Sequence, residues 1–98
     1  MTYELLVRPE AESDMLAAHA WYEDRKPGLG AQFLQAVESC LETIRRYPLA
    51  YAKVEGEVRR ALLKRFPYGI FYIVDGERIS ILACLHAKRR LGLWRPRL

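Results

Sequence analysis

The sequence is poor in cysteine, its glycines are scattered, and it has no long apolar run. It holds only two cysteines, six glycines and five prolines in 98 residues. Cys40 and Cys84 are too few for a disulfide framework, and the further ligands that a zinc site would need beside Cys84 and His86 are missing. We therefore expect buried, reduced thiols and no structural metal.

The same scarcity excludes several other classes of protein. The glycines are scattered, so the sequence contains no phosphate-binding loop. The longest apolar run, Ile70–Val74, is far shorter than the roughly 20 residues that cross a bilayer. Residues 1–4 show none of the pattern of a signal peptide. We expect a cytoplasmic protein with no membrane contact and no cofactor.

What the chain does contain fits one small globular domain, residues 1–98. It is 51% hydrophobic and 29% charged, and a single core of this size is thin enough to be completed by a partner. The net charge of +4 is unevenly spread, with a net −5 in residues 1–42 and a net +9 in residues 43–98. Such a basic half favours nucleic acid, an acidic protein segment or anionic lipid as a partner.

Apolar periodicity in the first half predicts a short strand followed by two helices. Residues 3–7 alternate as a strand does, except that Leu6 is apolar on the polar side, and Pro9 suits the first position of a helix over residues 9–25. Residues 26–30 are helix breakers, and a second helix with one apolar face ends at Tyr47 before a proline. So short a connection predicts an antiparallel helical hairpin.

The second half reads as β-structure. After a loop at 48–56 we predict strands over 58–66, 70–74 and 78–86, with turns at 66–69 and 75–76. In the last strand, strict alternation would place Ile79, Ile81, Ala83 and Leu85 on one face. The expected fold class is α+β, in the order βααβββ. The helical hairpin packs on one face of a small, mainly antiparallel sheet, and a basic C-terminal tail is left for the other.

Cationic side chains recur along the strand predicted over 58–66. Arg59 and Arg65 would share one face of that strand, and Arg60 and Lys64 the other. Charges of this kind protect an exposed sheet edge, which is one interpretation. The planar guanidinium also clamps phosphate or carboxylate, so the same residues are candidates for binding.

The end of the chain offers a second group of candidates. His86 precedes Lys88, Arg89 and Arg90. A histidine at a strand end is commonly a polar surface residue, but a neutral imidazole beside cations would also suit a general base toward an RNA 2′-hydroxyl. Trp94 could stack on nucleotide bases. We favour the alternative in which it packs on the open sheet face, because so short a chain needs that buried area.

Several of these segments form a pattern. They are Pro9-Glu10-Ala11, Trp21-Tyr22-Glu23, the stretch Val58–Tyr72 with its arginine pair and Phe66-Pro67-Tyr68, and the run from His86 through Trp94 to Arg97. In this order, over nearly the whole chain, they resemble the RelE/ParE superfamily of toxins from bacterial type II toxin–antitoxin systems. Such proteins are often labelled plasmid stabilisation proteins.

The resemblance implies a toxin that a cognate antitoxin holds inactive in a hetero-oligomer. RelE-like members cleave mRNA on the ribosome, whereas ParE-like members inhibit DNA gyrase. The arginine pair, the Phe-Pro-Tyr turn, the tryptophan and the lack of any tyrosine after Tyr72 favour the ParE-like branch. We therefore expect a gyrase inhibitor that is not itself an enzyme.

The two branches would use the basic residues differently. A gyrase inhibitor would bind its target or antitoxin through Arg59, Arg60, Arg65, His86, Lys88, Arg89, Arg90, Trp94 and Arg97. In a ribosome-dependent endoribonuclease, Arg59, Arg65 and Arg90 would stabilise the transition-state charge and His86 would transfer the proton. A generic nucleic-acid binder, with a steep salt dependence, is a third possibility.

Overall fold

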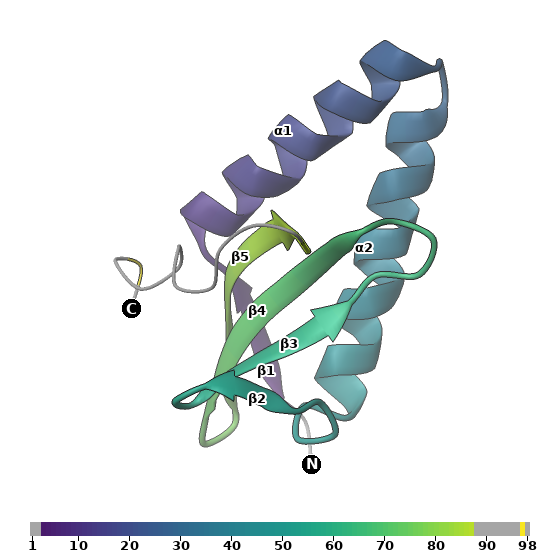
Figure 1. Ribbon diagram of the computed structural model, residues 1–98. Coiled ribbons are helices and arrows are strands. Elements are labelled where there is room, and N and C mark those ends of the chain that lie inside the picture. The colour runs from purple at the N-terminus through teal and green to yellow at the C-terminus, as the bar shows by residue number, and fades with distance from the viewer. Residues whose placement is uncertain (1–2, 88–96, 98) are drawn as a thin grey trace.

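The computed structural model describes residues 3–87 and residue 97. Helices α1 (Pro9–Arg25) and α2 (Leu29–Arg46) form the predicted hairpin beside one sheet (Figure 1). The strands are β1 (Glu4–Val7), β2 (Lys53–Glu55), β3 (Val58–Leu62), β4 (Tyr68–Asp75) and β5 (Arg78–His86). The fold is α+β, with the helical hairpin on one face of the sheet, as the sequence predicted.

The sheet has the strand order β1-β5-β4-β3-β2. β1 pairs with β5 in parallel, and every other neighbouring pair is antiparallel. β1 forms one edge of the sheet. It can pair with β5 in parallel because the chain passes through both helices and three strands between them. β1 ends at Val7 and reaches only to Ile81, so among the described residues no strand lies beside the second half of β5 on that edge.

Tight contacts fix the turn between the two helices. Gly28 has a left-handed φ of 89°, and its N–H and that of Gly30 both donate to the Glu23 carboxylate, at 3.0 Å. These bonds satisfy N–H groups at the start of α2 and lower the pKa of Glu23. A Cβ at Gly30 would lie 2.8 Å from the His19 carbonyl oxygen, so only glycine fits where the helices approach.

The turn between β3 and β4 is anchored to the helices by aromatic packing. The Phe66 ring lies 4.9 Å from that of Tyr22 on α1 and 5.4 Å from that of Phe33 on α2, measured between centroids. Tyr68 adds a further contact with Phe33 at 5.2 Å. Phe66 is therefore part of the hydrophobic core and Tyr68 packs against it, and the edge-to-face ring pairs add to the stability gained from burial.

A second anchor joins the middle of the sheet to the chain that follows α2. The Tyr72 side chain is fully buried, and its hydroxyl donates a hydrogen bond of 2.7 Å to the carbonyl oxygen of Pro48. Burial raises the pKa of Tyr72 to about 12. This bond fixes the start of the segment that leads to β2.

Two details of the β-region differ from the prediction. The strand predicted over 58–66 ends at Leu62, because the Leu63 N–H bonds to the Tyr68 carbonyl and closes the hairpin. The predicted loop 48–56 contains β2, which pairs with β3. A strand of three residues is too short to show alternation in a sequence.

The face assignment in β5 was also wrong in part. Tyr72 pairs with Ile81 but Phe71 pairs with Ala83, so Leu82 is an extra residue that forms a β-bulge. Beyond it, Ala83 and Leu85 turn to the face away from the helices, whereas Ile79 and Ile81 face them. A bulge of one residue inverts every later side chain, and His86 consequently lies on the helix side.

Replacing Tyr72 with phenylalanine tests the second anchor. We expect Tyr72→Phe to lower the free energy of unfolding by about 1–2 kcal/mol, because the buried Pro48 carbonyl loses its donor. Equilibrium urea unfolding at neutral pH measures this.

The stability of the same variant should also depend less on alkaline pH than that of the wild type. A tyrosine whose pKa is higher in the folded state contributes stability that is fully present below about pH 10 and is lost as the pH rises through about 12. The wild type should therefore lose more stability over this range than Tyr72→Phe. Equal losses would contradict the assigned burial.

Candidate functional site

Arg59 lies on β3 directly opposite Tyr72 of β4. Its guanidinium donates to the backbone carbonyls of Leu49 and Tyr51. Together with the Tyr72 hydroxyl on Pro48, it locks residues 48–51 against the sheet. Arg59 thus positions a segment of backbone, a role that its residue type and spacing alone did not suggest.

Arg60 and Arg65 have different neighbours from Arg59. Arg60 faces away from the helices, and its aliphatic stem lies over Gly69, where an added Cβ would be 3.2 Å from it. Arg65 is exposed in the turn after β3 with a left-handed φ of 69°, which is uncommon for residues other than glycine. Its Nη2 lies 3.5 Å from Oε1 of Gln32 on α2. The predicted sharing of one strand face by Arg59 and Arg65 is therefore wrong.

His86 lies at the end of β5 beside a groove. Its ring packs against that of Tyr68 with 5.4 Å between centroids. The groove has a volume of about 700 Å³ and runs between α1 and the end of β5. Its walls include Asp14, Trp21, Tyr22, Tyr68 and His86. We call it the α1–β5 groove.

Asp14 has a structural role at the edge of β5 that the sequence did not predict. Its carboxylate accepts a hydrogen bond of 3.0 Å from the Cys84 N–H, on the edge of β5 that β1 does not cover. The same oxygen lies 2.7 Å from Nη1 of Arg97, which also donates to the Leu82 carbonyl. Arg8 in turn donates to the Arg97 carbonyl. Asp14 and Arg97 thus occupy part of the open strand edge.

Of the candidate nuclease residues, Arg59, Arg65 and His86 lie apart from one another. Arg59 pairs with Tyr72 and His86 with Tyr68, four positions apart on β4. At about 3.3 Å per residue and 4.8 Å per strand, their backbones lie on the order of 16 Å apart. Arg65 lines a different groove from His86. Lys88, Arg89, Arg90 and Trp94 lie outside the described residues, so their predicted roles stay predictions.

The second groove has a volume of about 430 Å³ and lies between α2 and the end of β3. We call it the α2–β3 groove. Its helix side carries Gln32, Gln35, Ser39 and Thr43, and its sheet side carries Leu62, Lys64 and Arg65. The polar residues recur at helical spacing, which is the signal by which the sequence could have revealed this wall.

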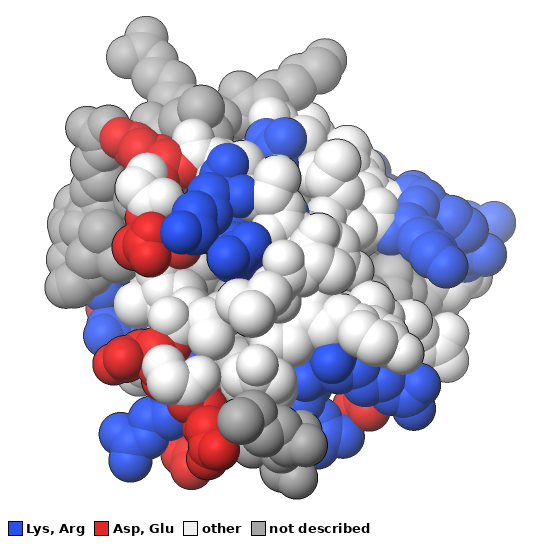
Figure 2. Space-filling model, turned by 90° about the horizontal axis from the view of Figure 1, so that it is seen from below, with Lys and Arg blue, Asp and Glu red and all other residues white. Residues whose placement is uncertain are grey.

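The surface charge is divided among several groups. Figure 2 shows Lys and Arg in separate clusters around a largely uncharged centre, with carboxylates beside some of them. The described residues form no continuous basic stripe on this face of the kind that tracks a nucleic-acid backbone. The uneven charge along the sequence therefore becomes, on this face, a set of local basic sites.

The thiols are poorly suited to chemistry. Burial raises the pKa of Cys40 to about 11 and that of Cys84 to about 12, so neither forms a thiolate at neutral pH. Among residues 3–87 and 97, no group of three or more His, Cys, Asp or Glu is placed to hold a metal ion. Neither helix in this part of the chain is long and apolar enough to cross a membrane.

Comparisons with known proteins agree with this picture. A family model described as "ParE toxin of type II toxin-antitoxin system, parDE" matches residues 5–91. A solved chain from the "Chromosomal ParDE TA system from P. aeruginosa" has a TM-score of 0.67 and 21% identity, and the match covers 87% of this chain and 96% of that one. No curated protein gives a significant match. The solved chain shows a common fold, and the family match extends over most of the sequence.

Removing the Asp14 carboxylate tests the contact at the β5 edge. We expect Asp14→Ala to lower the free energy of unfolding by roughly 1–3 kcal/mol, because the Cys84 N–H and Arg97 both lose an ionised acceptor. Asp24→Ala, at an exposed position of the same helix, is the control and should change little. An equal unfolding midpoint for both variants would contradict the assignment.

Proposed function

Because the chain belongs to the ParE toxin family of type II toxin–antitoxin systems, we propose that it arrests growth by binding and inhibiting DNA gyrase. The family match over residues 5–91 carries this proposal. The toxin acts as a binder: it occupies a surface of the enzyme through apolar and cationic contacts and breaks no covalent bond itself.

The geometry of the described residues supports binding over RNA cleavage. A ribonuclease needs a proton-transfer group and cations around the same phosphate. Here the Arg59 guanidinium is held by two backbone carbonyls, and Arg65 and His86 line separate grooves. The residues of the family signature thus support the scaffold on which a binding surface rests.

We further propose that a cognate antitoxin neutralises the toxin in a hetero-oligomer. The solved neighbour comes from a chromosomal ParDE TA system, which favours the same arrangement for this chain. A net +9 in residues 43–98 suits an acidic antitoxin segment. Neutralisation would then follow from covering the basic surface that meets the target.

Supercoiling assays with the purified toxin and its His86→Ala variant test the proposed target. Both proteins should inhibit gyrase fully at saturating amounts, because binding requires no proton transfer and the loss of one predicted contact residue lowers affinity without abolishing inhibition. A general acid or base contributes about 10²–10⁴-fold to a rate, so a nuclease would lose nearly all activity in this variant.

The controls separate misfolding from mechanism. Thermal unfolding checks that His86→Ala is folded, and induced expression compares growth arrest by the two proteins. Unimpaired supercoiling at saturating wild-type toxin would overturn the proposed target. Loss of growth arrest in a folded His86→Ala variant that still inhibits supercoiling would instead favour the ribonuclease.

A further inference from the structure

The Asp14 carboxylate and the Arg97 guanidinium join the first half of α1 to the end of the chain. Nη1 of Arg97 lies 2.7 Å from one oxygen of Asp14, and Nη2 lies 3.4 Å from the other, so both ends of the guanidinium face the carboxylate. The same Nη1 donates to the Leu82 carbonyl at 3.2 Å. Because 83 positions separate the two charged residues in the sequence, this contact depends entirely on the tertiary fold.

The backbone of Arg97 is held as well as its side chain. Nη1 of Arg8 donates to the Arg97 carbonyl at 2.8 Å. Arg8 is itself fixed, since its N–H donates to the Ile81 carbonyl of β5 at 3.0 Å. Arg97 therefore has partners in the residue before α1, in α1 and in β5, and its place in the structure is defined by all three.

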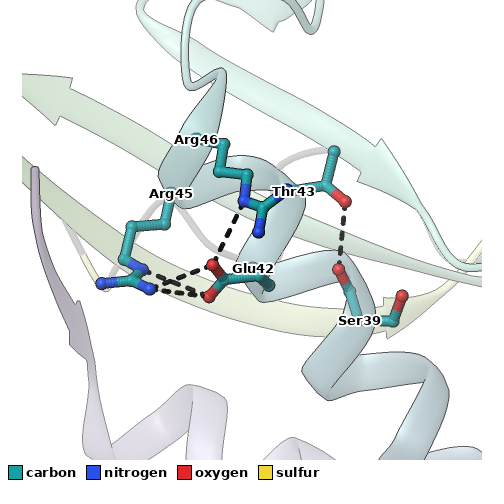
Figure 3. A network of polar contacts seen from close by, with 5 residues as sticks. All are labelled: Ser39, Glu42, Thr43, Arg45 and Arg46. Atoms are coloured by element: carbon teal, nitrogen blue, oxygen red, sulfur yellow. Dashed lines mark hydrogen bonds and ion pairs between the residues drawn. The ribbon is translucent and has the colours of Figure 1, made fainter.

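Burial distinguishes this ion pair from the exposed pairs of the molecule. The side chains of Arg97 and Asp14 are 21% and 16% exposed. Figure 3 shows the contrasting case on α2, where Arg45 and Arg46 share the Glu42 carboxylate and the three side chains are 45% to 68% exposed. Water and salt screen such exposed pairs, so they contribute little, whereas breaking a partly buried pair leaves a charge without its partner.

The ion pair brings the end of the chain back to the middle of β5. β5 ends at His86, and the next N–H, that of Ala87, donates to the Pro67 carbonyl at 2.7 Å. Leu82, which Arg97 contacts, precedes Ala87 by five positions, which at about 3.3 Å per residue is on the order of 16 Å. Residues 87 and 97 are therefore both attached to the sheet, at points well separated along one strand.

Between these two attached residues the sequence carries its one run of three consecutive cations. Lys88, Arg89 and Arg90 form this run, and residues 88–96 contain no Asp or Glu. These cations are among the target contacts predicted from the sequence, and they lie outside the described residues. A chain that is attached on both sides has fewer conformations to lose when it binds, so attachment lowers the entropy cost of association.

We propose that Asp14 and Arg97 are positioning residues for gyrase inhibition. Their ion pair fixes the chain on the C-terminal side of the cations at 88–90, so that these cations meet the enzyme with less loss of conformational freedom. This inference rests on the proposed function, since it says how the toxin presents its charge to that target.

The contacts of Arg97 favour this indirect role over direct binding of the target. Its guanidinium is already bonded to Asp14 and to the Leu82 carbonyl. The pair of opposite charges has no net charge, so it adds no net attraction toward an acidic or phosphate-bearing surface. We therefore expect the loss of either partner to act through the position of the chain.

Conservative variants separate the ion pair from the hydrogen bond at the strand edge. Asp14→Asn keeps an oxygen that can accept from the Cys84 N–H but loses the charge that holds Arg97. Arg97→Gln removes the guanidinium and leaves the bond between Asp14 and Cys84 in place. Glu42→Gln and Arg46→Gln make the same changes of charge in the exposed cluster of Figure 3 and are the controls.

Supercoiling assays with purified, folded variants give the first readout. Asp14→Asn and Arg97→Gln should each raise the toxin concentration for half-inhibition by about tenfold, and the two controls by less than about twofold. The double variant of Asp14 and Arg97 should be no weaker than the weaker single variant, because both changes remove the same interaction. Arg97→Lys keeps the charge without the planar guanidinium and should lose less than Arg97→Gln.

Limited proteolysis reports on the position of the chain itself. Trypsin cleaves after Lys and Arg, and mass spectrometry identifies products cut after residues 88–90. This cleavage should be several-fold faster in Asp14→Asn and Arg97→Gln than in the wild type and the controls, while cleavage after Arg45 on α2 stays unchanged. A general loss of stability would instead speed cleavage at both places.

Three results would overturn the inference. They are unchanged inhibition by the folded single variants, a double variant whose loss is the product of the two single losses, and equal cleavage after residues 88–90 in all proteins. Inhibition by the wild type, which the proposed function requires, is measured separately from these differences between variants. A wild type that leaves gyrase active would therefore contradict the proposed function, whereas equal potency of the variants would contradict only the positioning role.

Discussion

The hydrogen bond from the buried Tyr72 hydroxyl to the Pro48 carbonyl is the contact on which much of this structure depends. It joins the central strand to the segment after α2, and Arg59 extends the connection to Leu49 and Tyr51. Without the Tyr72 donor, the buried Pro48 carbonyl would lose its partner, which proteins seldom tolerate. The same contacts fix Tyr51 at the end of the α2–β3 groove, so core stability and the shape of a surface site have a common cause.

This connection gives a physical meaning to the sequence signature of the family. Arg59 and Tyr72 lock a loop, Phe66 and Tyr68 pack the β3–β4 turn against both helices, and Glu23 satisfies the start of α2. These residues mark the fold in the sequence because their side-chain contacts stabilise it. Fold does not fix the target, which depends on the residues exposed around this scaffold.

Much of the architecture could be predicted from local pattern, and the failures have local causes. The helices have a proline start, breakers between them and a long apolar face on α2, so their bounds were close to those observed. The bulge at Leu82 left no mark in an uninterrupted apolar run, and β2 was too short to detect. The left-handed turn at Arg65 depends on tertiary packing of Phe66, and Asp14 meets Cys84 and Arg97 only through the fold.

We propose that this ParE-family toxin acts as a stoichiometric binder of gyrase and not as a catalyst. A titration of one toxin preparation against fixed gyrase, and in parallel against a translated mRNA, distinguishes the two. On this proposal, supercoiling falls in proportion to added toxin and reaches its limit near equimolar amounts, while the mRNA stays intact. Cleavage of the mRNA by toxin far below stoichiometric amounts, with supercoiling unchanged, would contradict it.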